Sequence, residues 1–579
     1  MIHYVIDVKK PVGGQDLVEI IPGELFLSLG LFIGISPGRE LLVELHGNGL
    51  EIRSETGLAG EFQKRLDVPG KAHATHPSRY GELADNGLDG PVYRQSLTVT
   101  ETKSFLSKSI QLVYTYLQIS GEPEIIRGNI TTDPTFSLES AWVLPMEGAP
   151  LSRARLTVSG SRIESLTGDS SPDPPSILVI PGLINLHSHL DYSALTNLNS
   201  GSDSTILPWI KNLVRASRNF SPEDFLASAL EGATRAALSG TTLIADSSYS
   251  GASARALART GLKGIVGLEL FGLDETHAEK IFSAWQDRLS ALENDPDKDL
   301  DEALGEGRVC LTVSPHAPYT VSPALWRLAD RWAEERSMPV LAHLSESQEE
   351  CDWLAGTCED LDNFLMWVLP GDEQEKRNLL SSIAWKGMGM SPVEHLAGHG
   401  LVNRRLLAAH LTRASRKDID TLAVAGAGAA HCPRSNMRLR NGTAPLLTMR
   451  EAGLKVGLGT DSLASCDSLS ILDEARFALS LHGQEGASSH PFLSYLELAT
   501  IEAARTLGID TETGSLLPGK AADLCVIDLP RDLAAPGELP ELSTVLDYLS
   551  AAPIAVSQVY VNGRIIVDQG RPVWLDRAI

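Results

Sequence analysis

Residues 178–190, LVIPGLINLHSHL, form an apolar run that ends in two histidines, a pattern typical of a buried strand with polar residues at its end. Successive side chains of a strand point to opposite faces, so that residues two apart share one face. His187 and His189 would therefore converge on the same side and could bind one metal ion. Taken alone, such a pair is as compatible with polar packing as with a metal site.

Segments of this type recur seven more times, and longer helical patterns separate them. One such pattern opens on Ser221, has Pro222 at its first helical position and closes on Gly240. Eight strands that alternate with helices predict an α/β fold, a (β/α)₈ TIM-like barrel. The further segments are TTLIADSS from Thr241, GIVGLELFG from Gly264, VCLTVSPHA from Val309, PVLAHLSE from Pro339, RLLAAHLT from Arg405, AGAAHCPRSN from Ala427 and KVGLGTDS from Lys455.

Both flanks of the expected barrel (residues 181–509) have short β patterns instead of this alternation. We expect residues 135–180 and 510–579 to form one small composite β-domain. Residues 1–134 contain alternating β patterns, a Gly/Asp-rich stretch and one expected helix over residues 104–118, but no motif. They predict an extra N-terminal domain, β-rich or α+β, whose role is left open.

The bulk composition of the 579 residues is that of a soluble globular protein, with 43% hydrophobic and 21% charged residues. A net charge of −25 disfavours nucleic acid and anionic membranes as partners. No apolar run approaches the roughly 20 residues that span a bilayer, and no secretory signal is visible. Six scattered cysteines make no disulfide framework. We expect a cytoplasmic protein with a small-molecule substrate.

Side chains capable of chemistry follow the ends of most predicted strands, where TIM barrels gather their catalytic residues. His343 ends the fifth strand, and Glu346 lies three residues later, with helix capping as its alternative role. Asp461 ends the eighth strand and could instead be an N-cap. His410 ends the sixth strand, and His316 follows the fourth. Their shared position predicts one active site.

Three imidazole nitrogens, one carboxylate oxygen and a water make up a catalytic Zn²⁺ or Fe²⁺ site. No lysine occurs in residues 310–319, so that a carboxylated lysine bridging two metals is not expected there. We therefore predict one divalent metal ion, Zn²⁺ with Fe²⁺ as the alternative. The residues that match this ligand set are His187, His189, His343 and Asp461.

The chain resembles the amidohydrolase superfamily, in particular its branch of mononuclear aminohydrolases. That branch includes cytosine and guanine deaminases, S-adenosylhomocysteine/methylthioadenosine deaminases, aminodeoxyfutalosine deaminases and triazine chlorohydrolases. The resemblance begins near residue 137 and leaves the preceding segment without a counterpart. It is carried by PGLINLHSHLDYSAL, LPWIKNLV, GTTLIADSS, SPHAPYTVSP, HLSESQEE, SPVEHLAGHGL, AAHLTRAS, HCPRSNMRLRNG, GLGTDSLASCDSL and GSLLPGKAADLCVID.

By position, the resemblance implies a role for each candidate residue. Glu346 would be the proton shuttle, and His410 would orient and polarise the attacking water. His316 would contact the substrate near its leaving group, and Trp209 would pack on the nucleoside part. His431 receives no ligand role. The implied metal ligands are His187, His189, His343 and Asp461.

The implied activity is hydrolytic deamination of a ring amine. Asp461 and His410 would help to remove a proton from the attacking water, and Glu346 would protonate the neighbouring ring nitrogen. HAPYTVSP, HLSESQEE, SPVEHL, CPRSN and TDSLAS are most similar to aminodeoxyfutalosine deaminases. This similarity implies 6-aminodeoxyfutalosine as the substrate and a place in menaquinone biosynthesis.

Several alternatives stay open. The nearest is a deaminase of S-adenosylhomocysteine, adenosine or guanine, followed by a chlorohydrolase or amidase that uses the same residues. A non-catalytic binding protein is the most remote. Residues 358–390 either overhang the pocket and set specificity or elaborate the surface. The resemblance is compatible with a homo-oligomer. Four further histidines are expected on the solvated surface: His395, His399, His482 and His490.

Overall fold

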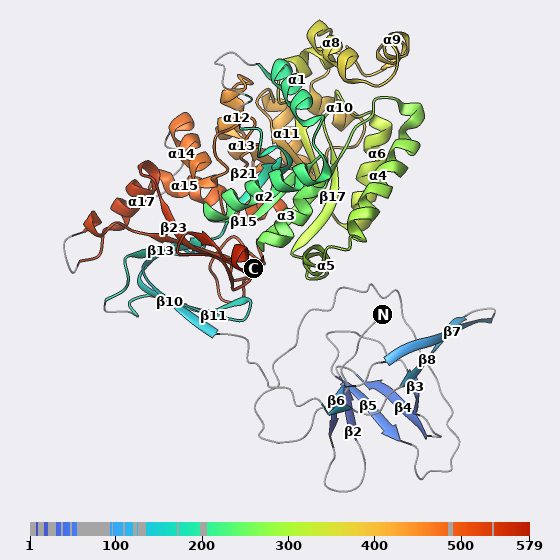
Figure 1. Cartoon of the computed structure of the whole chain (residues 1–579), viewed down its shortest axis with the longest axis vertical. Helices are drawn as coiled ribbons and strands as arrows, with labels where there is room; N and C mark the ends of the chain where they lie inside the picture. The colour runs from blue at the N-terminus through green and yellow to red at the C-terminus, as the bar shows by residue number, and fades with distance from the viewer. Residues whose placement is uncertain are drawn as a thin grey trace. The chain divides into compact units, whose positions relative to one another are not determined.

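The computed structural model describes two separate units, Met1–Thr132 and Asp133–Ile579 (Figure 1). In the first unit only strands within residues 7–125 are described. In the second, the description covers residues 135–170, 173–196, 198, 205–483, 490–534 and 538–578. Among the helices of these ranges, none combines the length and apolar character that a bilayer crossing requires.

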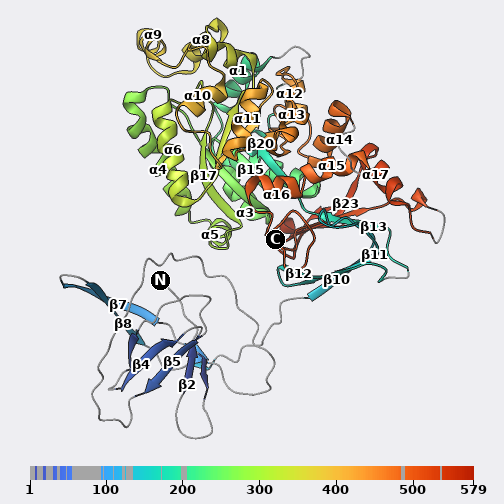
Figure 2. The ribbon, with the colours of Figure 1, turned by 180° about the vertical axis from the view of Figure 1, so that it is seen from behind.

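Eight parallel strands form a barrel in chain order, and helices surround them (Figure 1, Figure 2). The first and last strands lie side by side, because the backbone N–H groups of Thr460 and Asp461 both donate to His187 O at 3.0 Å. The predicted (β/α)₈ barrel is confirmed. Its strands are β14 (Leu183–Ser188), β15 (Thr241–Ser248), β16 (Lys263–Leu270), β17 (Val309–Pro315), β18 (Val340–Leu344), β19 (Leu406–His410), β20 (Gly428–His431) and β21 (Lys455–Leu458).

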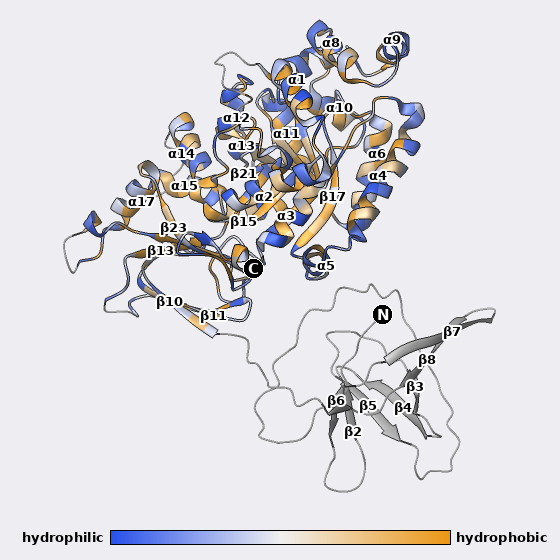
Figure 3. Ribbon diagram, viewed as in Figure 1, coloured by the Kyte–Doolittle hydropathy of each residue, from blue (hydrophilic) through white to orange (hydrophobic). Residues whose placement is uncertain are grey.

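The helices around the barrel bury one face each, as an amphipathic sequence requires. In Figure 3, β17 is largely orange (hydrophobic), whereas α4 and α6 show both colours. The helices are α2 (Pro222–Leu238), α3 (Ala252–Thr260), α4 (Ala278–Glu293), α5 (Lys298–Gly305), α6 (Pro323–Arg336), α11 (Arg416–Ala425), α12 (Pro433–Arg438), α13 (Leu446–Glu451), α14 (Ile471–His482), α15 (Pro491–Leu498), α16 (Ile501–Leu507) and α17 (Leu542–Ala551).

The caps of α2 show how local sequence sets these helices. Ser221 and Asp224 exchange side-chain to backbone hydrogen bonds in a capping box, and Pro222 occupies the first turn. Gly240 follows the helix with a φ of +95°, a conformation that suits glycine. The expected helix between Ser221 and Gly240 is confirmed.

A second sheet combines strands from both sides of the barrel. The first predicted barrel strand in fact divides at Gly182, where a Cβ would lie 2.2 Å from Thr242 Oγ1, and its first half joins this sheet. Val179 pairs with Val526 across the central antiparallel contact. The order is β12 (Arg162–Thr167), β11 (Leu151–Ser159), β10 (Thr135–Val143), β13 (Ile177–Pro181), β22 (Leu524–Asp528), β23 (Ala555–Val561), β24 (Arg564–Asp568) and β25 (Arg571–Pro572).

The N-terminal unit is β-rich, and the helix expected over residues 104–118 is wrong. Those residues belong to β7 (Leu97–Ser107) and β8 (Ile110–Ile119), which pair antiparallel. IQLVYTYLQI is rich in β-branched and aromatic residues, which favour strands over helices. The other described strands are β1 (Asp7–Lys9), β2 (Leu17–Ile20), β3 (Gly30–Ile35), β4 (Arg39–His46), β5 (Gly49–Ser54), β6 (Tyr93–Arg94) and β9 (Glu124–Ile125).

Helices from two connections gather over the C-terminal ends of the barrel strands. α1 (Ile206–Ser217) follows β14, and α7–α10 lie between β18 and β19 (Figure 1). Trp209 of α1 and Phe364 of α8 belong to one apolar cluster. Residues 358–390 therefore overhang the barrel mouth, as one of the two expectations stated. The bounds are α7 (Gln348–Ala355), α8 (Glu359–Val368), α9 (Glu373–Ser382) and α10 (Pro392–Gly398).

Candidate active site

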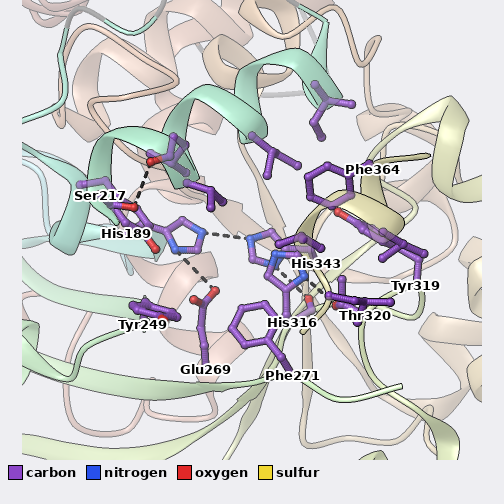
Figure 4. A pocket seen from close by; sticks show the side chains of 18 of the residues that line it. His189, Ser217, Tyr249, Glu269, Phe271, His316, Tyr319, Thr320, His343 and Phe364 are labelled. Atoms are coloured by element: carbon purple, nitrogen blue, oxygen red, sulfur yellow. Dashed lines mark hydrogen bonds and ion pairs between the residues drawn. The ribbon is translucent and has the colours of Figure 1, made fainter. Parts of the chain in front are cut away.

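Three histidines meet at the C-terminal end of the barrel. His187 and His189 come from the end of β14, and His343 comes from β18. One ring nitrogen of each lies within 4.8 Å of the others, and His189 Nε2 lies 3.0 Å from His343 Nε2. All three side chains are buried. Figure 4 shows His189 and His343 facing each other in the cavity. The structure thus brings together the C-terminal ends of two strands, β14 and β18, that are far apart in sequence.

Asp461 completes this group from the loop after β21. Its Oδ1 lies 3.9 Å from His187 Nε2 and 3.8 Å from His189 Nε2. Oδ2 accepts a hydrogen bond from Ser435 Oγ at 2.6 Å. Burial opposes ionisation of the carboxyl, but His189 and His410 outweigh it and hold the pKa of Asp461 below its usual value. The site therefore combines an anionic oxygen with the imidazoles.

The donor set fits a divalent metal ion. Burial is the main reason that the pKa values of His187, His189 and His343 are low, and neutral imidazole is the ligand form. His343 Nδ1 donates to His316 O at 2.9 Å, so Nε2 is the unprotonated nitrogen of this ring and carries the lone pair. Among the described residues, the buried His187 Nε2 has no hydrogen-bond partner. A shared cation would satisfy these nitrogens at once.

Gly459 lets β21 approach β14 closely enough to bring Asp461 to the histidines. A Cβ on this residue would lie 2.8 Å from His187 Cβ and 3.0 Å from Cys432 Sγ. Gly459→Ala is expected to force the two strands apart and to weaken metal binding about 10- to 100-fold, as loss of ligand support does.

Competition of the purified protein with a metal chelator measures this affinity. Gly398→Ala is the matched control, because no described atom lies within 4 Å of its added Cβ, and it should keep the parental affinity. Equal affinities of the two variants would contradict the packing argument.

We call His187, His189, His343 and Asp461 the metal group. Glu346 and His410 face each other beside it. Glu346 Oε1 lies 3.7 Å from His410 Nε2. His410 Nδ1 donates to Asn436 Oδ1 at 2.8 Å, so that Nε2 is left as a proton acceptor. Burial raises the pKa of Glu346 to about 7, so the carboxyl can both hold and release a proton near neutrality.

Backbone geometry holds these side chains in place. Ser345, His410, Leu411 and Asp461 all have positive φ angles, of 49°, 75°, 51° and 59°. Such angles are unfavourable for residues other than glycine and concentrate at functional sites. The buried Glu350 supports the loop, because its carboxylate accepts hydrogen bonds from the backbone N–H groups of Ser345 and Glu346.

His316 and Trp209 also reach the site. The ring of His316 lies 4.7 Å from that of His343, measured between centroids, and its Nδ1 is 2.9 Å from Thr320 Oγ1. Trp209 is buried, and its Nε1 donates to Ala464 O at 3.0 Å. Both residues line the cavity. Seven of the eight candidate residues therefore line one cavity, and His187 adjoins it in the group with His189 and His343.

Glu269 is a site residue that sequence reasoning missed. It lies near the end of β16, is buried and points into the cavity, with Oε1 3.9 Å from His189 Nδ1 (Figure 4). Together with His316 and His343 it forms a second group able to hold a metal, which shares His343 with the first. Burial raises its pKa well above the usual value. The feature of the sequence that could have indicated Glu269 is a lone acidic residue at the end of an apolar strand.

The cavity has a volume of about 860 Å³ and extends from the metal group to the overhanging helices. Its inner end contains His189, Glu346 and Asp461, and its outer part lies between α1 and α8. A nucleoside-sized molecule fits a space of this size.

A buried group of histidines and a carboxylate at the C-terminal end of a (β/α)₈ barrel is typical of a metal-dependent hydrolase. The model of the amidohydrolase family matches residues 178–361 and 369–566, and the chain belongs to this family. It is 30% identical over 459 residues to a 5-methylthioadenosine/S-adenosylhomocysteine deaminase of Symbiobacterium thermophilum, which covers 74% of this chain and 93% of that protein. The chain is a metal-dependent deaminase that acts on carbon–nitrogen bonds.

Solved structures share the fold. A zinc-bound adenosine deaminase from Xanthomonas campestris has a TM-score of 0.59 at 23% identity and covers 76% of this chain and 98% of that one. An aminofutalosine deaminase of Helicobacter pylori has a TM-score of 0.58 at 19% identity and covers 74% and 100%. At these identities the likeness shows a common architecture.

Proposed function

We propose that the protein is a hydrolytic deaminase of 6-aminopurine nucleosides that carry a substituent at the 5′ position. The observation that carries the proposal is the placement of Glu346, His410 and Asp461 around the histidine group, at the inner end of a nucleoside-sized cavity. Relatives at 26–30% identity are named for deamination of 5′-modified adenosines, which supports the choice of substrate class.

We propose that one Zn²⁺, with Fe²⁺ as the alternative, occupies the metal group. A bound divalent ion supplies Lewis acidity, which makes water nucleophilic near neutral pH. The residues that would hold it are His187, His189, His343 and Asp461.

The protein's own residues move the protons. His410 Nε2 and the Asp461 carboxylate accept a proton from the attacking water, whose oxygen adds to C6 of the purine. Glu346 donates a proton to the adjacent ring nitrogen, so that no uncompensated charge develops. The hydroxyl now on C6 gives up its proton, which reaches the leaving nitrogen through Asp461 and Glu346. The C6–N6 bond then breaks, ammonia departs and the 6-oxo product remains. His316 would contact the substrate near the leaving group, and Trp209 would pack on the nucleoside.

Two kinds of substrate are the leading candidates within this class. The motifs around the site favour 6-aminodeoxyfutalosine, which would place the reaction in menaquinone biosynthesis. The names of the similar proteins favour 5′-methylthioadenosine or S-adenosylhomocysteine. Both leave the chemistry at the purine unchanged and differ in the group at the 5′ position.

Ammonia release by zinc-loaded protein tests the proposal. The substrate panel contains 6-aminodeoxyfutalosine, 5′-methylthioadenosine, S-adenosylhomocysteine, adenosine and guanine, with a chlorotriazine to detect chloride release. We expect at least one adenine nucleoside to be converted to its 6-oxo product. Activity on the triazine alone, or on no nucleoside, would contradict deamination of this class.

Asn441 is expected to tune the acidity of Glu346. Its Nδ2 donates to Glu346 Oε1 at 3.1 Å and so stabilises the charged form. Asn441→Leu removes that bond, which raises the pKa of Glu346 above about 7. The protonated donor then persists to higher pH, so that the falling alkaline limb of kcat should move upward by about one pH unit.

A pH profile of kcat for the parent and Asn441→Leu measures this shift. A purely structural role for Asn441 would lower kcat equally at all pH values, and that result would contradict the assignment.

A further inference from the structure

One face of α1 lines the cavity along the whole helix. The residues concerned recur at spacings of three and four, which places them on one side of a helix. The stripe is apolar for three turns and becomes polar only at Ser217 and the adjoining Arg218. Its apolar members are Ile206, Trp209, Ile210, Leu213 and Val214. Phe364, Leu365 and Val368 of α8 also line the cavity.

A row of aromatic rings continues from the catalytic end to the mouth of this cavity. The ring of Phe271 lies 4.9 Å from that of His316 and 6.4 Å from that of Tyr249, measured between centroids. Tyr249 is 6.1 Å from Phe225, which is 5.2 Å from Phe220. All of these residues line the cavity, and Figure 4 shows Phe271 and Tyr249 on the same side as Glu269. We call Phe271, Tyr249, Phe225 and Phe220 the aromatic strip.

The outer part of this cavity leaves large apolar side chains uncovered. Tyr249 is 48% exposed, Phe271 39% and Val368 37%. Covering exposed apolar surface of this kind with a ligand is favourable, because it removes the surface from water. Because Phe271 adjoins His316, a purine held at the metal group would direct its 5′ end along the strip.

Few charged side chains line this outer region. Among the described lining residues away from the metal group, the charged ones are Arg218 and Asp274. The Arg218 guanidinium lies 5.7 Å from the Trp367 ring centroid. Asp274 accepts hydrogen bonds from the Thr276 backbone N–H at 2.9 Å and from His277 Nδ1 at 2.7 Å. The Asp274 carboxyl is thus engaged within its own loop, and the outer lining is otherwise uncharged apart from Arg218.

We propose that the aromatic strip, α1 and α8 bind an aromatic or bulky apolar 5′ substituent of the nucleoside. The inference rests on the proposed function, since it assumes that the purine reacts at the metal group. Tyr249 and Phe271 are the specificity-determining residues, because they flank the cavity mouth and stay half exposed without a ligand.

Substrate discrimination tests this inference. The zinc-loaded protein is assayed with 5′-deoxyadenosine, 5′-methylthioadenosine and 5′-phenylthio-5′-deoxyadenosine. We expect kcat/KM to rise about tenfold from the methylthio to the phenylthio compound.

Substitutions in the aromatic strip test whether it causes the preference for the phenylthio compound. Tyr249→Ala and Phe271→Ala should each lower the ratio of kcat/KM for the phenylthio compound over 5′-deoxyadenosine by about tenfold. Tyr249→Phe keeps the ring and should restore the ratio. Leu447→Ala is the matched control, because Leu447 is 49% exposed but does not line the cavity, and it should leave the ratio unchanged.

Failures of the two proposals are distinguishable. If 5′-deoxyadenosine and its derivatives release no ammonia, the proposed deaminase function is wrong. The inference about the 5′ substituent is then wrong as well. If 5′-deoxyadenosine reacts but the phenylthio group brings no gain, only the inference is overturned. If Tyr249→Ala leaves the ratio unchanged and alters the oligomeric state in light scattering, the strip is a contact between copies, which also overturns it.

Discussion

Glu346→Gln is expected to lower kcat for ammonia release by about 10³-fold with little change in KM, the range found for loss of a general acid. The amide has nearly the same shape as the carboxyl and can still receive the hydrogen bond from Asn441. It cannot pass a proton to the purine ring, however. Because Glu346 contributes mainly in the transition state, the loss should fall on kcat rather than on binding.

Steady-state kinetics on the best nucleoside of the panel measure this effect. Glu349→Gln is the matched control, since Glu349 lies three residues further along the same loop and helix but does not line the cavity. It should keep kcat within about twofold, the range of most surface substitutions. A Glu346→Gln enzyme that retained a large share of the parental rate would contradict the proton-donor role.

His343→Ala is expected to abolish metal binding and, with it, about 10³- to 10⁴-fold or more of the activity, since a catalytic metal supplies several kcal/mol to the transition state. Its Nε2 lies 3.0 Å from His189 Nε2 within the metal group, so its removal leaves an incomplete ligand set. Metal analysis of the purified variant should find the ion lost.

His431→Ala is the control for this experiment. His431 is also buried and ends β20, two strands further round the barrel, but its Nε2 lies 3.1 Å from His482 Nε2 and takes no part in the metal group. Added Zn²⁺ should raise the melting temperature of the chelator-treated parent and of His431→Ala, but not that of His343→Ala. Retention of the ion by His343→Ala would overturn the ligand assignment.

The barrel could be predicted from the sequence because its alternation of strands and helices is visible in the hydrophobic pattern. Parallel strands that alternate with helices bring their C-terminal ends to one edge, so His187, His343 and Asp461 had to be neighbours once the strands were recognised. Glu269 escaped notice, because a single acidic residue within GIVGLELFG has no partner nearby in sequence. Its role depends on the distance to His189, which only the folded barrel defines.

Tertiary packing explains the other errors. His395 was expected at the surface but is buried, with its ring 6.2 Å from that of Trp385. Helical residues next to apolar neighbours can face either way, and the sequence does not say which. The expected helix over residues 104–118 failed because its residues favour strands. The two readings of residues 358–390 could be separated only by seeing which space α8 covers.

The composite sheet has a consequence for the order of synthesis. Ser176, just before β13, donates a side-chain hydrogen bond to Leu529 O, 353 positions later. At about 5–20 residues per second, a ribosome needs roughly 20–70 s to make that intervening chain. Throughout this interval the edge of β13 that later receives β22 is unpaired, and an open strand edge invites pairing with other chains. Nascent chains halted within the barrel should therefore depend on chaperones more than the finished protein does.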